Sequence, residues 1–150
     1  SILQNPAHLP LIYALLFGMP GIPCIYYGSE WGAEGKKQDG DDALRPSFEQ
    51  PIENDLTARI TAMAKAHRES RALCYGGFKQ LVLTNKQCIW ERETDGERVL
   101  VPVNIDAQPY HAHFDARCGR AVDLITGEMH DFGGGSELPP YSAYFWKCER

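Results

Sequence analysis

The sequence predicts an α+β fold in which a mainly helical first part is followed by an antiparallel β-sandwich. Up to residue 76, apolar residues recur with helical spacing on either side of one buried strand. From residue 77, short alternating strands are separated by turn residues. The hydrophobic period changes at Gly76-Gly77, so we expect two parts, 1–76 and 77–150.

The chain begins with the signals of a helix start. Asn5 can cap the helix, and Pro6 suits its first position because a proline there loses no helical hydrogen bond. Gly18 followed by Pro20 ends it. We expect one buried stripe of helical spacing, formed by Leu9, Ile12, Tyr13 and Leu16 and widened by Leu11 and Leu15.

A strand over Ile22–Tyr26 follows. It is apolar on both faces, as a buried parallel strand should be, so we expect Cys24 and Tyr26 in the core. A polar tract rich in Gly and Asp then runs from Trp31 to Pro51. Loops of this length in compact domains are usually functional or disordered, and the position of this one after a strand favours a functional loop. A second helix, capped by Asn54 or Asp55, continues to about Arg71.

The second part reads as short strands. We place them at about 78–83, 87–93, 98–105, 110–114, 121–124, 129–132 and 143–148. Asn85-Lys86 and Asp95-Gly96 are typical hairpin turns. The alternation of valines in 98–105 predicts one buried face, and Pro102 predicts an edge position or a bulge because it cannot donate to a ladder. We expect Gly133–Ser136 to be a flexible loop.

The run GIPCIYYGSEWG from Gly21 to Gly32 resembles a signature of the alpha-amylase family of glycoside hydrolases, G-x-P-x-I-Y-Y-G-x-E-x-G. Ser29 stands where an Asp is most usual. The resemblance implies the last β/α unit of a (β/α)8 barrel and the loop that borders its sugar-binding cleft. The strands ending in LPPYSAYFWK are similar to the antiparallel C-terminal β-domain that follows this barrel.

The pattern is similar to maltodextrin-acting members such as cyclomaltodextrinases, neopullulanases and alpha-glucosidases. Retaining glycosidases use two carboxyl groups close together. The resemblance places these groups on strands that this chain does not include, so we expect no catalytic residue here. Glu30 and Glu34 could form a local pair, but loop carboxylates that bind backbone are the expectation.

The resemblance also suggests substrate-binding residues. Family members acting on short maltodextrins carry an Asp-Pro-x-x-Arg pattern in this loop, and Asp41 and Arg45 match its spacing, with Asp42 replacing the proline. The alternative is an ion pair that pins the loop. Tyr27 and Trp31 could each offer an aromatic face to a glucose ring or pack in the core.

Composition excludes several classes of function. The net charge of −5 without a Lys/Arg run argues against nucleic acid, and the apolar run 9–17 is too short to span a membrane. We expect no cofactor or metal; a loose calcium site at 39–42 and zinc at His111 and His113 are minor alternatives. Five cysteines without a C-x-x-C pair suggest free thiols in a reducing cytoplasm. The missing initial Met leaves a secreted parent open.

We therefore expect the C-terminal portion of an alpha-amylase family enzyme that acts on α-glucan oligosaccharides and is inactive in isolation. The strand over Ile22–Tyr26 needs parallel neighbours that this chain does not supply. Either other parts of a parent cover it, or the chain self-associates through its exposed barrel elements, or these elements repack onto the β-domain. The rival hypothesis is a stand-alone, non-catalytic β-sandwich module that binds carbohydrate or a protein partner.

Overall fold

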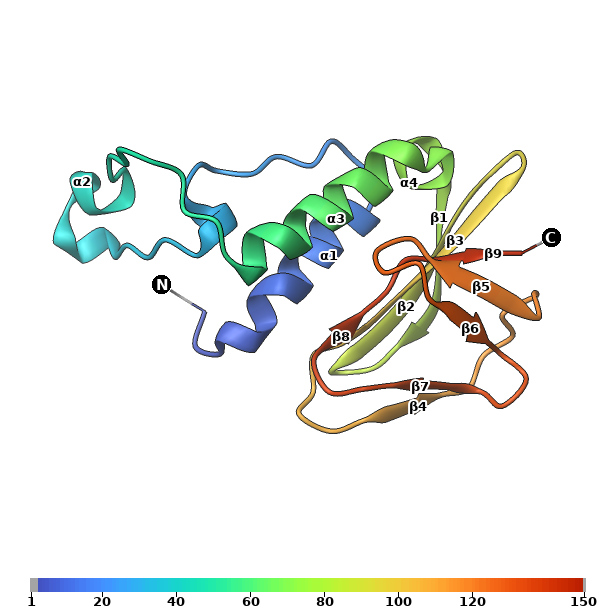
Figure 1. Cartoon of the computed structure of the whole chain (residues 1–150). Helices are drawn as coiled ribbons and strands as arrows, with labels where there is room; N and C mark the ends of the chain where they lie inside the picture. Colours follow the sequence, from blue (N-terminus) through green and yellow to red (C-terminus); the bar gives the residue numbers. More distant parts are fainter. Residues whose placement is uncertain (1–2, 150) are drawn as a thin grey trace.

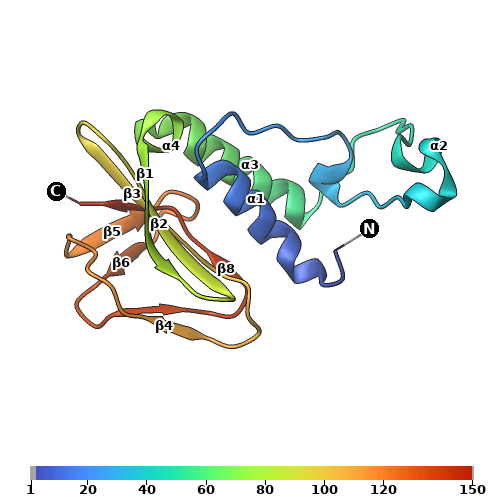
Figure 2. The same ribbon diagram turned by 180° about the vertical axis from the view of Figure 1, so that it is seen from behind.

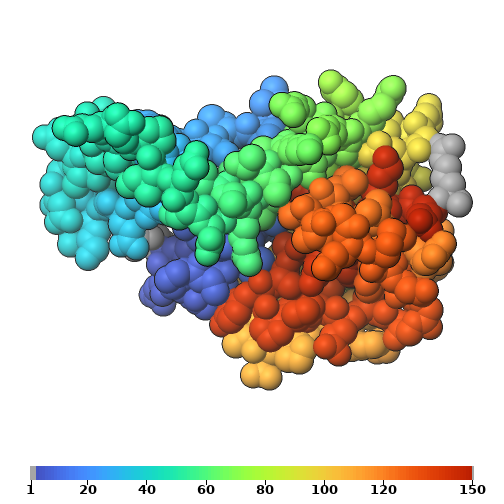
Figure 3. Space-filling view, viewed as in Figure 1, coloured from blue at the N-terminus to red at the C-terminus, as the bar shows by residue number. Residues whose placement is uncertain are grey.

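The computed structural model describes residues 3–149. Helices α1 (Leu9–Gly18) and α3 (Asp55–Glu69) lie side by side against one face of a seven-stranded antiparallel sheet (Figure 1). The segment that carries the short helix α2 (Asp41–Leu44) extends away from the sheet, as the view from behind also shows (Figure 2). In the space-filling view this segment forms an arm at the opposite end of the molecule from the strands (Figure 3).

Both predicted helix starts are confirmed. Asn5 Oδ1 accepts a hydrogen bond from the backbone N–H of Ala7 at 3.0 Å, and Pro6 opens a 3-10 turn, η1 (Pro6–His8), that leads into α1. The side chain of Asn54 caps α3 by accepting from the Thr57 N–H at 3.0 Å.

The second helix ends earlier than predicted. Ser70 leaves the helical conformation with φ −100° and ψ 117°, so α3 stops at Glu69. The Ser70 hydroxyl then accepts from the Leu73 N–H at 3.1 Å and caps a further short helix, α4 (Arg71–Tyr75). The continuous helical spacing of the sequence conceals this break because a serine is tolerated inside a helix as well as at its cap.

The buried face of α1 differs from the predicted stripe. Its buried residues are Leu11, Tyr13, Ala14, Phe17 and Gly18. Ile12, which the prediction placed inside, is 45% exposed. Since the helix is apolar on nearly every side, its spacing cannot select one face, and packing against the sheet and α3 makes that choice.

The predicted strand over Ile22–Tyr26 is wrong for this chain. The segment is extended but pairs with no strand among the described residues. Ile22 is 96% exposed, Tyr26 is 55% exposed and Cys24 is also exposed, so the expected core positions lie at the surface. An extended segment becomes a strand only when a neighbouring strand accepts and donates its backbone hydrogen bonds.

The seven predicted strands of the second part are confirmed, with shifted ends. The strands of the structure are β1 (Gly77–Leu83), β2 (Gln87–Thr94), β3 (Glu97–Asn104), β4 (Tyr110–Ala112), β5 (Arg120–Asp123), β6 (Met129–Asp131), β7 (Ser136–Leu138), β8 (Ser142–Ala143) and β9 (Trp146–Cys148). The last predicted strand is thus split into β8 and β9. The predicted flexible loop Gly133–Ser136 is wrong at its last residue, because Ser136 is buried and begins β7, a strand that the sequence did not indicate.

These strands form two antiparallel sheets. The larger has the order β1-β2-β3-β9-β5-β6, with β8 also paired to β3, and the smaller consists of β4 and β7. The two sheets pack face to face through a small cluster that includes Ile89, Leu100, Leu138 and Trp146. The opposite face of the larger sheet carries the helices. The result is a β-sandwich with a helical layer on one side.

Pro102 occupies a central strand, so its predicted edge position is wrong. β3 lies between β2 on one side and β8 and β9 on the other. The Pro102 carbonyl accepts from Tyr144 N at 3.2 Å, at the break between β8 and β9. There the next amide, Phe145 N–H, donates to Asp123 Oδ1 at 2.8 Å. The interrupted neighbour tolerates a residue without an N–H.

The alternation in β3 buries both faces, whereas the pattern predicted one. Val99, Val101 and Val103 face the helices, where they join α1 and α3 in the main core. Leu100 faces the smaller sheet and is fully buried. The sequence could not show this second buried face because its cover is a separate small sheet, which forms only when the distant strand β7 pairs with β4.

Candidate functional site

The glycine-rich loop has a shape that requires glycine at both ends. Gly28 and Gly32 have φ of 85° and 79°, in the left-handed region that other residues avoid, and they bracket the 3-10 turn η2 (Ser29–Trp31). A Cβ on Gly28 would lie 2.9 Å from Cε2 of Phe48. Gly28 therefore also permits the close approach of the long polar loop.

The start of α3 holds this loop in place. The Asn54 side chain, which caps α3 with its oxygen, donates from Nδ2 to the Trp31 carbonyl at 3.0 Å. Thr57 Oγ1 donates to the Glu30 carbonyl at 3.1 Å. The capping residues thus fix the backbone of η2, and through it the direction of the Trp31 ring.

An open pocket of about 420 Å³ lies where this loop meets the polar tract. It is lined by Tyr27, Trp31, Arg45 and the segment from Pro46 to Pro51. Phe48 is its aromatic centre. The Phe48 ring meets Trp31 edge-on, with centroids 5.1 Å apart, and meets Tyr27 in the same way at 6.2 Å. Such edge-to-face contacts hold aromatic rings in defined directions.

The polar groups around the pocket are suited to hydrogen bonding. Burial raises the pKa of Tyr27, and a hydrogen bond with Tyr26 adds to this, while the charge of Arg45 acts in the opposite direction. The Tyr27 phenol therefore stays neutral and keeps a donor. Trp31 Nε1 and Glu30 Oε2 are buried atoms that have no hydrogen-bond partner within residues 3–149.

The pocket brings together three of the four predicted binding residues: Tyr27, Trp31 and Arg45. Asp41 does not line it; this residue is exposed at the start of α2. In the described part of the chain no ion pair joins Asp41 to Arg45, so the alternative of a pinning ion pair finds no support. Phe48 is a pocket residue that was not predicted; its only signal in the sequence is a single large aromatic within a polar tract.

The pocket does not bring two carboxyl groups together. Of the residues that line it, only Glu49 is acidic. Hydrolysis with retention needs two carboxyl groups about 5 Å apart, across the scissile bond. With aromatic faces, a guanidinium and a phenol, the arrangement is suited to holding a neutral polyol rather than to cleaving it.

Other sites are not evident in the part of the chain that the structure describes. Residues 3–149 contain no group of three or more His, Cys, Asp or Glu side chains arranged to hold a metal ion. No helix among them has the length and apolar character needed to cross a membrane. All five cysteines lie within this range, and none is in a disulfide.

Comparison with known proteins shows which enzymes the chain is similar to. No family model matches the chain. It is 28% identical over 142 residues to a cyclomaltodextrinase of Thermoanaerobacter pseudethanolicus. The aligned region covers 94% of this chain and 25% of that protein. It is 27% identical over 133 residues to a cyclomaltodextrin glucanotransferase of Niallia circulans. This aligned region covers 87% of this chain and 17% of that protein.

The fold of this chain matches one part of a solved alpha-amylase. The crystal structure of the alpha-amylase of Geobacillus thermoleovorans in complex with acarbose matches 97% of this chain and 34% of its own with a TM-score of 0.84, at 20% identity. The predicted resemblance to the alpha-amylase family is therefore confirmed over most of the chain. The chain spans about a quarter or less of the length of these two curated relatives.

Proposed function

We propose that this chain is the C-terminal part of an alpha-amylase family retaining glycosidase that acts on α-glucosidic bonds of maltodextrin-like substrates. Residues 1–76 would complete a (β/α)8 barrel, and residues 77–150 would form the C-terminal β-domain. The curated relatives, an enzyme named for cyclomaltodextrin cleavage and one named for glucanotransfer, support this substrate class.

One observation carries the proposal. The apolar segment Ile22–Tyr26 has no regular secondary structure, exposes Ile22, Cys24 and Tyr26, and pairs with no strand within residues 3–149. It leads directly to Tyr27, which lines the aromatic pocket. In a (β/α)8 barrel each strand pairs with two neighbouring strands, and the loops after the strands surround one site. A segment without strand neighbours that ends at a pocket is expected if the other barrel strands belong to a longer parent chain. In this arrangement Tyr27, Trp31 and Arg45 form one wall of the cleft, and Asp41 lies on the same arm, outside the pocket as it stands here.

In this proposal the chain supplies substrate binding, and the catalytic carboxyl groups come from other parts of the enzyme. The wall residues bind and orient a glucose unit through aromatic faces, the Arg45 guanidinium and the Tyr27 hydroxyl. The nucleophilic carboxylate and the proton donor lie outside this chain. By itself the chain therefore binds maltooligosaccharide weakly and does not hydrolyse it.

Two measurements on the purified chain test this function. Release of reducing sugar from maltodextrin should stay at the background level. Calorimetric titration with maltoheptaose should show binding in about the millimolar range, weakened about tenfold by Trp31→Ala or Arg45→Ala. Arg68→Ala, whose side chain is 79% exposed and lies outside the pocket, serves as the control.

The outcomes separate the hypotheses. Hydrolysis by the isolated chain would show that the catalytic groups are within it after all. Binding that both pocket variants leave unchanged would favour a β-sandwich module that recognises carbohydrate elsewhere on the chain. If the chain does not bind maltoheptaose at all, neither the pocket nor the sandwich recognises this sugar. That result would overturn the proposed role of the pocket.

A further inference from the structure

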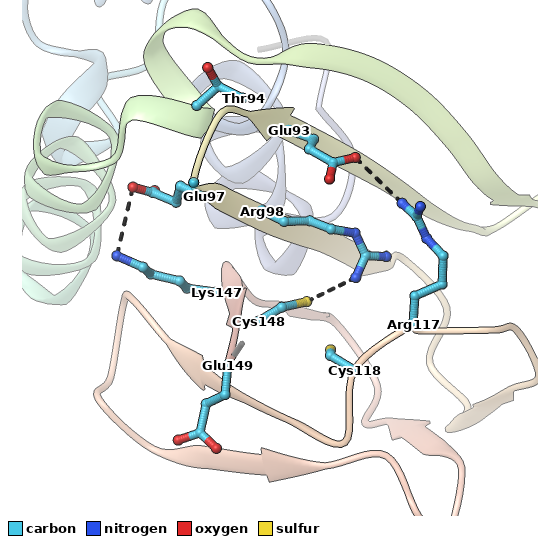
Figure 4. Close-up of a pocket in the computed structure, with 10 residues that line it drawn as sticks. Glu93, Thr94, Glu97, Arg98, Arg117, Cys118, Lys147, Cys148 and Glu149 are labelled. Carbon is cyan, nitrogen blue, oxygen red and sulfur yellow. Dashed lines mark hydrogen bonds and ion pairs between the residues drawn. The ribbon is translucent and has the colours of Figure 1, made fainter.

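A second pocket, of about 440 Å³, lies on the β-sandwich, far from the aromatic pocket in sequence. Its lining includes Cys118, Cys148, Arg98 and Arg117 (Figure 4). The close-up shows the sulfur atoms of Cys118 and Cys148 both pointing into it, beside the guanidinium of Arg98. Neither cysteine has a role in the proposed carbohydrate site.

Backbone pairing brings these two cysteines together. Cys148, in β9, lies opposite Ala121 of β5, and Glu149 N donates to the Arg120 carbonyl at 2.9 Å. Cys118 is in the turn just before β5, so both cysteines lie at the same end of this strand pair. The close-up shows the two sulfur atoms as neighbours on the wall of the pocket (Figure 4). A disulfide needs such neighbouring side chains, whose Cα atoms lie within about 7 Å of each other once the bond has formed.

We propose that Cys118 and Cys148 form an intramolecular disulfide bond when the chain meets a low-molecular-weight disulfide such as oxidised glutathione. The bond fastens the C-terminal strand β9 to the turn before β5. In a compartment with a reducing glutathione pool both thiols stay free, so the pair reports the redox state around the protein.

The reaction takes place in two exchange steps. The Cys118 thiolate attacks one sulfur of oxidised glutathione, which forms a mixed disulfide and releases one glutathione thiolate. The Cys148 thiolate then attacks the Cys118 sulfur and releases the second glutathione. The two thiol protons end on the two glutathione molecules, which together gain the two electrons that the cysteines lose.

The surroundings favour this order. Burial raises the pKa of Cys148 to about 12, with a further contribution from its hydrogen bond to Cys118, so Cys148 is rarely ionised at neutral pH and Cys118 meets the oxidant first. Arg98 Nη1 donates to Cys148 Sγ at 3.2 Å, which places a positive charge where the second thiolate must form. Glu91 holds the Arg98 guanidinium from its other side.

Trypsin provides a direct readout. It cuts after Arg117, Arg120 and Lys147, so the bond would join the tripeptide Cys118-Gly119-Arg120 to a peptide that begins with Cys148-Glu149-Arg150. The native chain is incubated with oxidised glutathione, free thiols are alkylated, and the digest is analysed by mass spectrometry. We expect the linked pair, its loss on reduction, and a rise in Tm of about 5 °C on oxidation.

Variants confirm the assignment. Cys118→Ser and Cys148→Ser should each abolish the linked pair and the rise in Tm, whereas Cys24→Ser, at an exposed cysteine, should leave both unchanged. The proposal is overturned if, after incubation with oxidised glutathione, Cys118 and Cys148 of the wild type are still free and become alkylated, or if each carries glutathione instead of the bond. It is equally overturned if the linked pair forms only in urea, because the folded structure would then not bring the thiols together.

Discussion

Arg92 Nη1 donates a hydrogen bond to the carbonyl oxygen of Gly18 at 3.1 Å, which joins strand β2 to the last residue of α1. The same carbonyl accepts from Trp90 Nε1 at 3.0 Å. Arg92 is only 1% exposed, and its other donors reach the carbonyls of Gly76 and Gly77. A single buried guanidinium thus satisfies the end of one helix and the turn that starts β1.

Replacing this guanidinium should destabilise the whole chain. Arg92→Met keeps the apolar stem but removes one donor from each of the three carbonyls, and only Gly18 keeps another, from Trp90. We therefore expect a loss of about 3 kcal/mol in the free energy of unfolding. Urea denaturation followed by tryptophan fluorescence measures it. Arg68→Met, at an exposed arginine, should change stability by less than about 0.5 kcal/mol. Equal effects of the two substitutions would contradict the role given to Arg92.

Gly18 should tolerate no side chain. A Cβ there would lie 2.8 Å from Cγ1 of Val101 and 3.2 Å from the Trp90 ring, in the core between α1 and the sheet. We expect Gly18→Val to lower the stability by about 2 kcal/mol and the Tm by about 6 °C. Gly134→Val is the matched control, because nothing lies within 4 Å of the corresponding position. A Tm for Gly18→Val equal to that of the control would show that α1 packs differently.

The ion pairs of Glu91 should make stability depend on acid. Burial alone would raise the pKa of Glu91, but hydrogen bonds and charges from Arg117 and Arg98 outweigh it and hold the pKa below its usual value. The folded state therefore binds this proton less readily than the unfolded chain. The stabilisation is complete above the unfolded-state pKa of about 4.3 and is lost as the pH falls through the lower folded-state pKa.

Glu91→Gln tests this directly. Its side chain is only 4% exposed, and its loss leaves the Arg98 charge without a carboxylate, so we expect a cost of about 3 kcal/mol at pH 7. The difference in free energy of unfolding between wild type and Glu91→Gln should be smaller at about pH 3 than at pH 7, as measured by urea unfolding at both pH values. Glu69→Gln, at an exposed carboxylate, should show no such difference. A difference that stays constant with pH would assign the cost to packing.

Asn54 should link the stability of α3 to the aromatic pocket. Asn54→Ala removes both the helix cap and the donor to the Trp31 carbonyl, so we expect a loss of about 1 kcal/mol and weaker binding of maltoheptaose. Asn54→Asp keeps the capping oxygen and loses only the donor. It should retain the Tm and still bind maltoheptaose more weakly. Wild-type affinity in Asn54→Asp would show that this hydrogen bond does not position Trp31.

The isolated chain should self-associate through its uncovered apolar residues. Ile12 on α1 is 45% exposed and Ile22 on the extended segment is 96% exposed. Size-exclusion chromatography with light scattering should show a mass above that of the monomer, reduced by the double substitution Ile12→Glu with Ile22→Glu. Leu83→Glu, at a 65% exposed leucine of β1, is the control. A monomeric wild type would indicate that these residues need no cover.

The candidate site was predictable only in part. The glycine-rich run predicted a loop with Tyr27 and Trp31 near a binding surface, and the spacing to Arg45 predicted a third member; the structure brings these three together. Phe48 was not predictable, because its role depends on the path by which the polar tract returns to Gly28. The place of Asp41 outside the pocket likewise depends on that path.

The sequence by itself determined the local elements: the caps at Asn5 and Asn54, the hairpin turns, and most strands of the sandwich. These depend on neighbours within a few residues, so spacing and turn chemistry suffice. Tertiary structure decided which face of α1 is buried, how Pro102 sits in a central strand, and why Ile22–Tyr26 remains unpaired. Each of these three features depends on a segment that is distant in the sequence or missing from the chain. Backbone hydrogen bonds and burial are complete only when that segment is in place.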